Sequence, residues 1–348
     1  RSGAGVTVEL VFDHGSRSSA LGMRDQHGTA ATAEGQAAAG TLHVEQWNYR
    51  AVELSACEGR RVIAIVLASA PGEDGGVVGY IDEVRMGSGR TLVPSLVASI
   101  LNPEPVDYVD TRRGTRSSSR YSRGNCLPAT ANPRGSLLLA PVTDAGSVNW
   151  LYTYDAARDE TGLPWLEAFS ISHQPSPWMG DWGTFQFFPS LDREGLPRMG
   201  RRARALPFRH SQEVARPHLY EVEFEQPLSV RIAPTAHGAI VEMRFPSEIG
   251  TVIFDNIDDR GSLEFDGAVV RATSWVGGEH SENTPLMHVH LLFDAVPAEA
   301  GRVEVDRRGA VAGFARFVLG TDRTLRFRIG TSFVSADIAT SVIEEELP

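Results

Sequence analysis

The sequence of 348 residues contains no lysine, only two cysteines and no long apolar run. All 33 basic residues are arginine, and 44 acidic residues bring the formal net charge to −11. This balance argues against a nucleic-acid partner, because proteins that bind polyanions are normally basic. No stretch approaches the ~18 apolar residues of a membrane span, so we expect no transmembrane segment.

The two cysteines, Cys57 and Cys126, stand far apart in the sequence. We expect them in different domains and therefore as free thiols, with a pairing between them as the alternative. No C-x-x-C motif for metal or redox chemistry is present. The cysteines therefore predict neither a disulfide framework nor a thiolate metal site.

The pattern of the remaining residues predicts an all-β protein. Short runs of β-branched and aromatic residues are separated by Gly, Pro, Asn and Asp, and there is almost no long helical pattern. We expect strands at residues 6–12, 61–67, 219–224, 229–232, 239–245, 287–293 and 324–329. Many short strands with turn signals are typical of sandwiches and jelly rolls.

The segment SILNPEPVDYVDTRRG carries two prolines and marks the expected domain boundary. Residues 1–98 would form a first β domain, and residues 104–333 a larger antiparallel β-sandwich. Residues 334–348 predict a helix with Ser335 as its N-cap, and we expect it to lead into further chain. Its apolar face would comprise Ile338, Val342 and Ile343.

The first domain contains the segments LGMRDQHG, VEQWNYRAVEL and GYIDEVRM. Together they resemble the galactose-binding-like jelly-roll modules often fused to secreted glycosidases, which implies an accessory module. Trp47, Tyr49 and Tyr80 are candidates for exposed rings that stack on sugar. If these rings are instead buried in the sandwich core, the module is structural.

The second domain carries a series of motifs: DYVDTRRGT, GNCLPATANPRGSLLLAP, WLYTYD, FSISHQPSPWMGDWGTFQFFP, FRHSQEVARPHLYEVEF and RIGTSFVSADIATSVIEEELP. In content and order they resemble the N-terminal β-sandwich of glycoside hydrolase family 92, the exo-acting α-mannosidases. The resemblance covers about residues 107–348. It implies a catalytic unit in which this sandwich packs against a helical (α/α)6 barrel that is absent from these residues.

The same resemblance implies hydrolysis with inversion, at a site that holds Ca²⁺ and lies between the two parts. The general acid and the general base would come from the helical catalytic domain in the same polypeptide, so no catalytic residue is expected in this segment. The implied substrates are mannose-containing glycans, and the implied location is extracellular.

The segment HQPSPWMGDWG, residues 173–183, has the composition of a rigid loop. Its prolines fix φ and its glycines allow sharp turns, so little ordering entropy would be lost on binding. We predict that it forms one wall of a sugar pocket, with Trp178 offering a flat apolar face. The substrate-binding candidates are His173, Trp178, Met179, Gly180 and Asp181. The alternative is a structural His173 and an Asp181 that caps a turn.

Asn125, in the segment RGNCLPAT, is the calcium ligand that the resemblance implies. Ca²⁺ takes about six to eight oxygen ligands, and a turn at Gly124–Asn125 can direct an oxygen outward. An Asn that only stabilises the turn through an Asx motif is the alternative.

Arginines gather where the family has a short Gly-rich stretch, at positions 112, 113, 116, 120 and 123. The planar guanidinium fork suits phosphate, so Arg112 and Arg113 predict a preference for an anionic mannoside such as a mannosyl phosphodiester. A solvated loop is the alternative.

Two other functions stay open. The chain could be a stand-alone carbohydrate-binding protein. It could also be a metal-dependent jelly roll, because His288 and His290 share one face of a strand, with His280 and Glu282 just upstream. The segment FDNIDDRG, residues 254–261, lacks the spacing of an EF-hand and predicts a hairpin turn.

Overall fold

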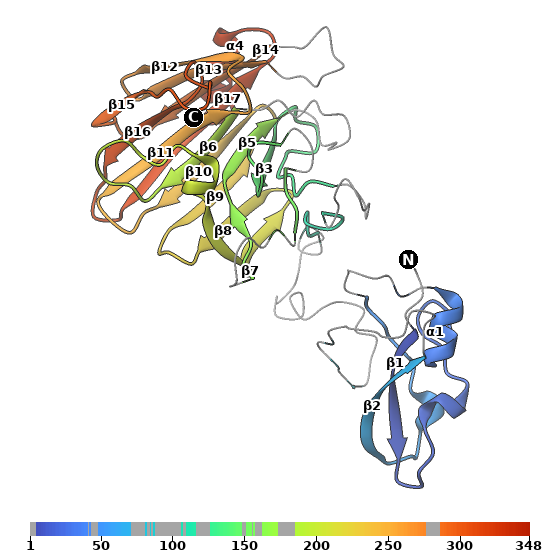
Figure 1. The fold of residues 1–348 in the computed structure, drawn as a ribbon. Helices are drawn as coiled ribbons and strands as arrows, with labels where there is room; N and C mark the ends of the chain where they lie inside the picture. The colour runs from blue at the N-terminus through green and yellow to red at the C-terminus, as the bar shows by residue number, and fades with distance from the viewer. Residues whose placement is uncertain are drawn as a thin grey trace. The chain divides into compact units, whose positions relative to one another are not determined.

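The computed structural model of the chain describes residues 5–40, 42, 48–70, 81, 84, 86–87, 106, 109–115, 126–147, 151–154, 156, 162–172, 185–275 and 286–348. The chain divides into two compact units, Arg1–Ile100 and Leu101–Pro348. The strand-rich fold is confirmed, and every described strand pair is antiparallel (Figure 1). No described helix is long and apolar enough to cross a membrane.

The first unit contains a two-stranded sheet of β1 (Gly5–Phe12) and β2 (Val62–Ala70). The short helix α1 (Ala33–Ala39), which the sequence pattern did not predict, packs so closely that a Cβ on Gly5 would lie 2.3 Å from the Ala33 carbonyl oxygen. Two 3₁₀ turns, η1 (Ser18–Leu21) and η2 (Ser55–Cys57), complete the described elements. The jelly-roll architecture stays a prediction.

The candidate sugar-stacking rings of the first unit are only partly described. Tyr49 is 49% exposed, whereas Trp47 and Tyr80 lie outside the described residues. Cys57 is buried beside Leu10 and Phe12, and both cysteines are free, as predicted.

The second unit is a β-sandwich of a nine-stranded and a six-stranded sheet. The nine-stranded order is β12-β13-β14-β17-β10-β9-β8-β7-β4. These strands are β4 (Trp165–Leu166), β7 (Leu206–Arg216), β8 (Leu219–Phe224), β9 (Ser229–Pro234), β10 (Gly238–Arg244), β12 (Gly261–Asp266), β13 (Val269–Trp275), β14 (Leu286–Phe293) and β17 (Thr324–Ser332).

The six-stranded order is β15-β16-β11-β6-β5-β3. Its strands are β3 (Leu138–Val142), β5 (Ala168–Ser172), β6 (Phe185–Ser190), β11 (Ile249–Asn256), β15 (Glu299–Arg302) and β16 (Gly313–Val318). Because β11 and β12 belong to different sheets, the predicted hairpin turn between them is wrong. The turn at residues 257–260 instead carries the chain from one sheet to the other.

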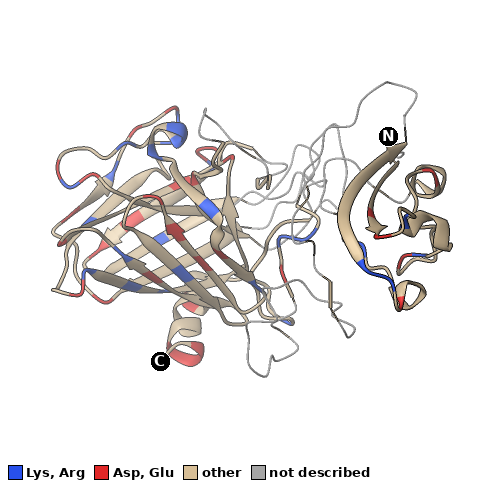
Figure 2. Ribbon diagram, turned by 90° about the horizontal axis from the view of Figure 1, so that it is seen from below, with Lys and Arg blue, Asp and Glu red and all other residues tan. Residues whose placement is uncertain are grey.

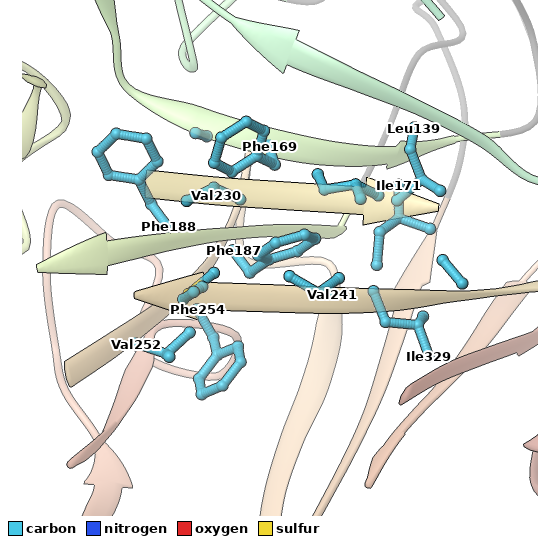
Figure 3. Close-up of a cluster of buried hydrophobic side chains, with 14 of the residues drawn as sticks. Leu139, Phe169, Ile171, Phe187, Phe188, Val230, Val241, Val252, Phe254 and Ile329 are labelled. Atoms are coloured by element: carbon cyan, nitrogen blue, oxygen red, sulfur yellow. The ribbon is translucent and has the colours of Figure 1, made fainter. Parts of the chain in front are cut away.

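The core lies between the two sheets and is rich in phenylalanine (Figure 3). Phe327 of the nine-stranded sheet lies 4.7 Å from Phe293 and 5.5 Å from Phe187, measured between ring centroids. Phe187 comes from the six-stranded sheet, so aromatic contacts join the two layers. Such contacts stabilise beyond the burial of area alone.

The two sheets differ in how their outer faces are covered. Strand β13 alternates buried and accessible residues, as expected when one face meets solvent. All six residues of β6 are buried, and so are the last seven of β11. The polar residues of these central strands, such as Gln186 and Asp255, therefore lie buried outside the core and need partners.

The C-terminal helix α4 (Ala336–Glu346) is confirmed, and the Ser335 side chain accepts a hydrogen bond from the Ile338 amide. The helix lies against β14 and β17 (Figure 1). The predicted apolar face is partly wrong. Val342 is buried, but Ile338 is 45% exposed, and Ala339 occupies the buried position instead. The face of the helix that packs against the sheet therefore includes Ala339 in place of Ile338.

Two glycines explain how closely α4 approaches the sheet. Gly238 of β10 and Gly330 of β17 are paired in register. A Cβ on Gly330 would lie 2.1 Å from the Ala339 carbonyl oxygen, and one on Gly238 would lie 3.0 Å from Val342 Cγ1. The helix backbone therefore sits where any larger residue would have a side chain.

Candidate functional site

The predicted sugar-pocket residues His173, Trp178, Met179, Gly180 and Asp181 lie outside the described residues. The structure does describe the two strands that their segment connects. Strands β5 and β6 pair through Ile171 and Phe185, which are both completely buried. Residues 173–184 therefore connect two paired, buried strands, and their ends are rigidly held.

A second segment, residues 116–125, includes the predicted calcium ligand Asn125 and also lies outside the described residues. Its stem is described. The Cys126 amide donates to the Gly114 carbonyl oxygen at 3.1 Å, which closes the ends of the segment. The Thr115 hydroxyl donates to the Arg112 carbonyl oxygen at 2.7 Å. Arg112 thus belongs to the base of this stem.

The stem is anchored by a buried carboxylate. The Glu213 side chain on β7 is completely buried, and strand pairing is irregular between Phe208 and Glu213. Four side chains surround it, and together with Glu213 they form what we term the Glu213 cluster: Arg112 Nη1 at 3.2 Å, His210 Nδ1 at 2.7 Å, Tyr152 Oη at 3.2 Å and Tyr220 Oη at 2.8 Å.

The electrostatics of the Glu213 cluster follow from this burial. Burial and the Glu213 charge raise the pKa values of Tyr152 and Tyr220 well above 10, so both phenols stay protonated and donate. Burial alone would lower the pKa of Arg112, but the hydrogen bond to Asp110 and the charges of Glu213 and Asp110 raise it. The cluster therefore pairs the Glu213 carboxylate with the Arg112 guanidinium inside the unit.

The aromatic ring of Tyr154 extends the cluster towards the stem. It stacks on the His210 ring with centroids 3.8 Å apart, and His210 Nε2 lies 2.8 Å from the Tyr154 carbonyl oxygen. The Tyr154 amide in turn donates to the Thr115 carbonyl oxygen at 3.4 Å. The cluster thus joins β7 to the stem through Arg112 on one side and Tyr154 on the other.

Both oxygens of Glu213 are occupied by donors, so this carboxylate is suited to positioning the stem and not to transferring protons. Sequence reasoning did not single out Glu213, His210, Tyr152 or Tyr220. The signal was present, because these residues lie within the motifs WLYTYD and FRHSQEVARPHLYEVEF. Only the fold shows that the two motifs meet at one carboxylate.

The two arginines predicted to bind an anionic substrate are placed differently. Arg112 Nη2 donates to Asp110 at 2.7 Å, and its Nη1 is directed to Glu213, so this guanidinium is held inside the protein. Arg113 is exposed. Of the two arginines, only Arg113 is therefore exposed to solvent.

The histidines of the alternative metal site lie on β14. His290 is buried, and its Nδ1 lies 2.9 Å from the Thr340 hydroxyl of α4. Burial and the nearby Arg271 lower the pKa of His290, against the opposing effect of Glu344. His288 pairs in register with Thr273 and Ser332. His280 and Glu282 lie outside the described residues.

The part of the chain that the structure describes contains no cluster of typical metal-binding side chains. No three His, Cys, Asp or Glu side chains come together there in a way that could hold a metal ion. His290 instead supports the docking of α4.

Comparison with known proteins adds independent information. The family model described as Glycosyl hydrolase family 92 N-terminal domain matches residues 108–332. A solved inverting mannosidase of family GH92 from Bacteroides thetaiotaomicron VPI-5482 is similar with a TM-score of 0.62 and 29% identity, over 72% of this chain and 34% of that one.

Two further solved structures share the fold at lower identity. An α-mannosidase of family GH92 from Bacteroides thetaiotaomicron, in complex with mannoimidazole, gives a TM-score of 0.54 and 19% identity over 69% of this chain and 34% of that one. A glycosyl hydrolase of family GH92 named ccman5 gives a TM-score of 0.53 and 18% identity, over 69% of this chain and 34% of that one. The chain thus spans about a third of these proteins. No curated protein matches the sequence.

Proposed function

The chain belongs to glycosyl hydrolase family 92 through an N-terminal domain of that family, and on this premise we propose that it is the sandwich part of an α-mannosidase. The whole enzyme would be exo-acting, would invert the anomeric centre and would remove terminal α-mannose from glycans, including N-glycans. Its site of action would be outside the cell. The match of the family model to residues 108–332 carries this proposal.

The proposed division of labour follows from the length of the relatives. This chain covers 34% of the solved inverting mannosidase, so two thirds of such an enzyme have no counterpart here. The general acid and general base would lie in that remainder. The buried Glu213 carboxylate is not a candidate for either role, because four side chains already occupy its oxygens.

Calcium is proposed as the cofactor on the strength of the family alone. The described residues do not provide a set of acidic or imidazole ligands, and Asp110 at the stem is already paired with Arg112. The contribution of this chain would therefore be limited to a few oxygens, with Asn125 as the first candidate. Calcium would supply positive charge that holds sugar hydroxyl groups.

The segment at residues 173–184 would form one wall of the sugar pocket. The strands at its two ends, β5 and β6, are paired and buried. The residues proposed to contact the sugar are His173, Trp178, Met179, Gly180 and Asp181. A preference for mannosyl phosphodiesters would depend on Arg113, because the internal partners of Arg112 leave it few free donors.

The experiment compares this chain with a longer polypeptide that continues into the helical domain. Mannose release would be measured from α-mannosides and from a mannosyl-phosphate-capped glycan, with and without a calcium chelator. We expect activity only in the longer, calcium-loaded protein, and a loss of activity in its Trp178→Ala variant. Sugar binding by the 348-residue chain without activity in either protein would favour the stand-alone binding function.

A further inference from the structure

A hollow of about 430 Å³ opens beside α3 (Arg201–Arg204) on the second unit. Figure 2 shows this basic turn as a blue helical turn on the sandwich. Three of the seven lining residues are arginines, and only one is acidic. The lining comprises Gly200, Arg201, Arg202, Ala203, Ile257, Asp306 and Arg308.

The floor of the hollow carries more positive than negative charge. The buried carboxylate of Asp255 is shared by three guanidinium groups. Arg204 Nη2 lies 3.1 Å and Arg201 Nε 3.4 Å from its Oδ2, and Arg308 Nη1 contacts the same oxygen. One buried carboxylate thus faces three buried or half-buried guanidinium groups, so positive charge is in excess on the floor.

Arg204 is part of this floor. Its burial lowers its pKa, the charge of Asp255 acts in the opposite direction, and the positive charges of Arg201 and Arg308 lower the pKa further. The other carboxylate at the hollow, Asp306, is 81% exposed in its side chain and lies 3.5 Å from Arg308 Nη2. Water therefore weakens its contribution to the charge balance.

The guanidinium groups of the floor are held in place. Arg201 Nη2 donates to the carbonyl oxygens of Asn256 at 2.7 Å and Ile257 at 3.0 Å. The Arg308 side chain is only 5% exposed. Arg202, in contrast, is exposed and has no hydrogen-bond or ion-pair partner among the described residues. The hollow thus combines two fixed cations with one whose five donors are free.

The loop on the other side of the hollow is strained. Asp306 and Arg307 have φ values of 44° and 65°, in the left-handed region that non-glycine residues rarely adopt. The Ala310 amide, which donates to Asp259 Oδ1 at 2.6 Å, helps to fix this loop. Backbone strain that the surroundings enforce is concentrated at functional sites, and Arg308 follows these two residues directly in the chain.

We propose that this hollow is a binding site for a phosphate or sulfate group, contacted by Arg202 and Arg201, with the buried Arg308 contributing positive charge from the floor. Guanidinium forks match the oxygens of a tetrahedral oxyanion, and an anion in the hollow would complete the charge balance of the buried floor. The site involves none of the residues predicted to bind mannose or calcium. It can therefore be tested without any glycosidase activity.

The test titrates the 348-residue chain by calorimetry with inorganic phosphate, with mannose 6-phosphate and with mannose, at constant ionic strength. We expect saturable binding of one or both phosphates and none of mannose. Binding of inorganic phosphate would identify a free ion as sufficient. Binding of the sugar phosphate alone would assign the site to a phosphate carried on a glycan. No saturable binding of either would overturn the proposal.

Two variants change the affinity in opposite directions. Arg202→Ala, which removes an exposed side chain, should weaken phosphate binding about tenfold through loss of a charge-assisted contact. Asp306→Asn, which removes the exposed carboxylate and suits left-handed φ, should strengthen binding. The control is Arg244→Ala, which removes one positive charge from an exposed position on β10 that does not line the hollow. Equal effects of Arg202→Ala and Arg244→Ala would show non-specific charge attraction and refute the site.

Discussion

Replacing Glu213 by glutamine tests whether the Glu213 cluster holds the stem of residues 110–126. The substitution keeps the size of the side chain but removes its charge and one acceptor oxygen. Four donor-bearing groups now converge on the carboxylate, and the new amide would direct its own N–H groups towards some of them. Arg112, with a side chain only 13% exposed, would lose its buried counter-charge.

The magnitude follows from this geometry. Breaking a buried, hydrogen-bonded ion pair costs about 3–5 kcal/mol, because a charge and several donors stay buried without partners. For a unit of this size, each kcal/mol shifts the melting temperature by about 2–4 °C. We therefore expect Glu213→Gln to lower the melting temperature by about 6–20 °C, measured by calorimetry.

The matched control is Glu225→Gln, the same substitution at a carboxylate that pairs with Arg209 at 2.8 Å but is 30% exposed. Exposed pairs contribute less than about 1 kcal/mol, so its melting temperature should stay close to that of the unchanged protein. Equal melting temperatures of the two variants would refute the view that Glu213 is a stabilising centre. Hydrogen exchange should also show faster exchange of the Cys126 amide in Glu213→Gln only.

Three further predictions concern the helix and the core. Gly330→Ala should displace α4, because the new Cβ would lie 2.1 Å from the Ala339 carbonyl oxygen. Faster amide hydrogen exchange across α4 would show this displacement. The control Gly301→Ala, whose Cβ would meet no atom within 4 Å, should leave the exchange unchanged. Because the pKa of His290 is lowered in the folded chain, stability should fall as pH drops below about 6.5, and denaturant titrations should show a shallower fall in His290→Gln. Phe327→Ala should cost about 3–5 kcal/mol in the same assay, since its ring is 1% exposed.

The strands were predictable where local pattern and burial agree. Residues 219–224 were predicted as a strand, and β8 has the same bounds. The N-cap Ser335 was predicted correctly because capping depends only on neighbouring residues. The helix face was predicted only in part, because the approach of Ala339 depends on Gly330, a residue of another element. Local patterns do not contain that information.

The candidate site was less predictable for a similar reason. The motifs of the sequence resemble the family and lead to the correct fold, but they do not show that Arg112 would turn inward to Glu213. The two residues are far apart in the sequence and meet only after the sheets have formed. The hollow beside α3 likewise brings Arg201 and Arg308 together from distant segments. The roles proposed for residues 173–184 and Asn125 stay predictions.

The position of β17 has a consequence for the synthesis of this chain. Although it is the last described strand of the sandwich in chain order, it lies in the interior of the nine-stranded sheet, between β14 and β10. Until residue 332 has left the ribosome, β10 and β14 each present an open edge, and such edges pair readily with other chains. Translation at about 5–20 residues per second makes this exposure last for seconds. The nascent sandwich thus depends on β17 to close this sheet, and α4 then packs against β14 and β17.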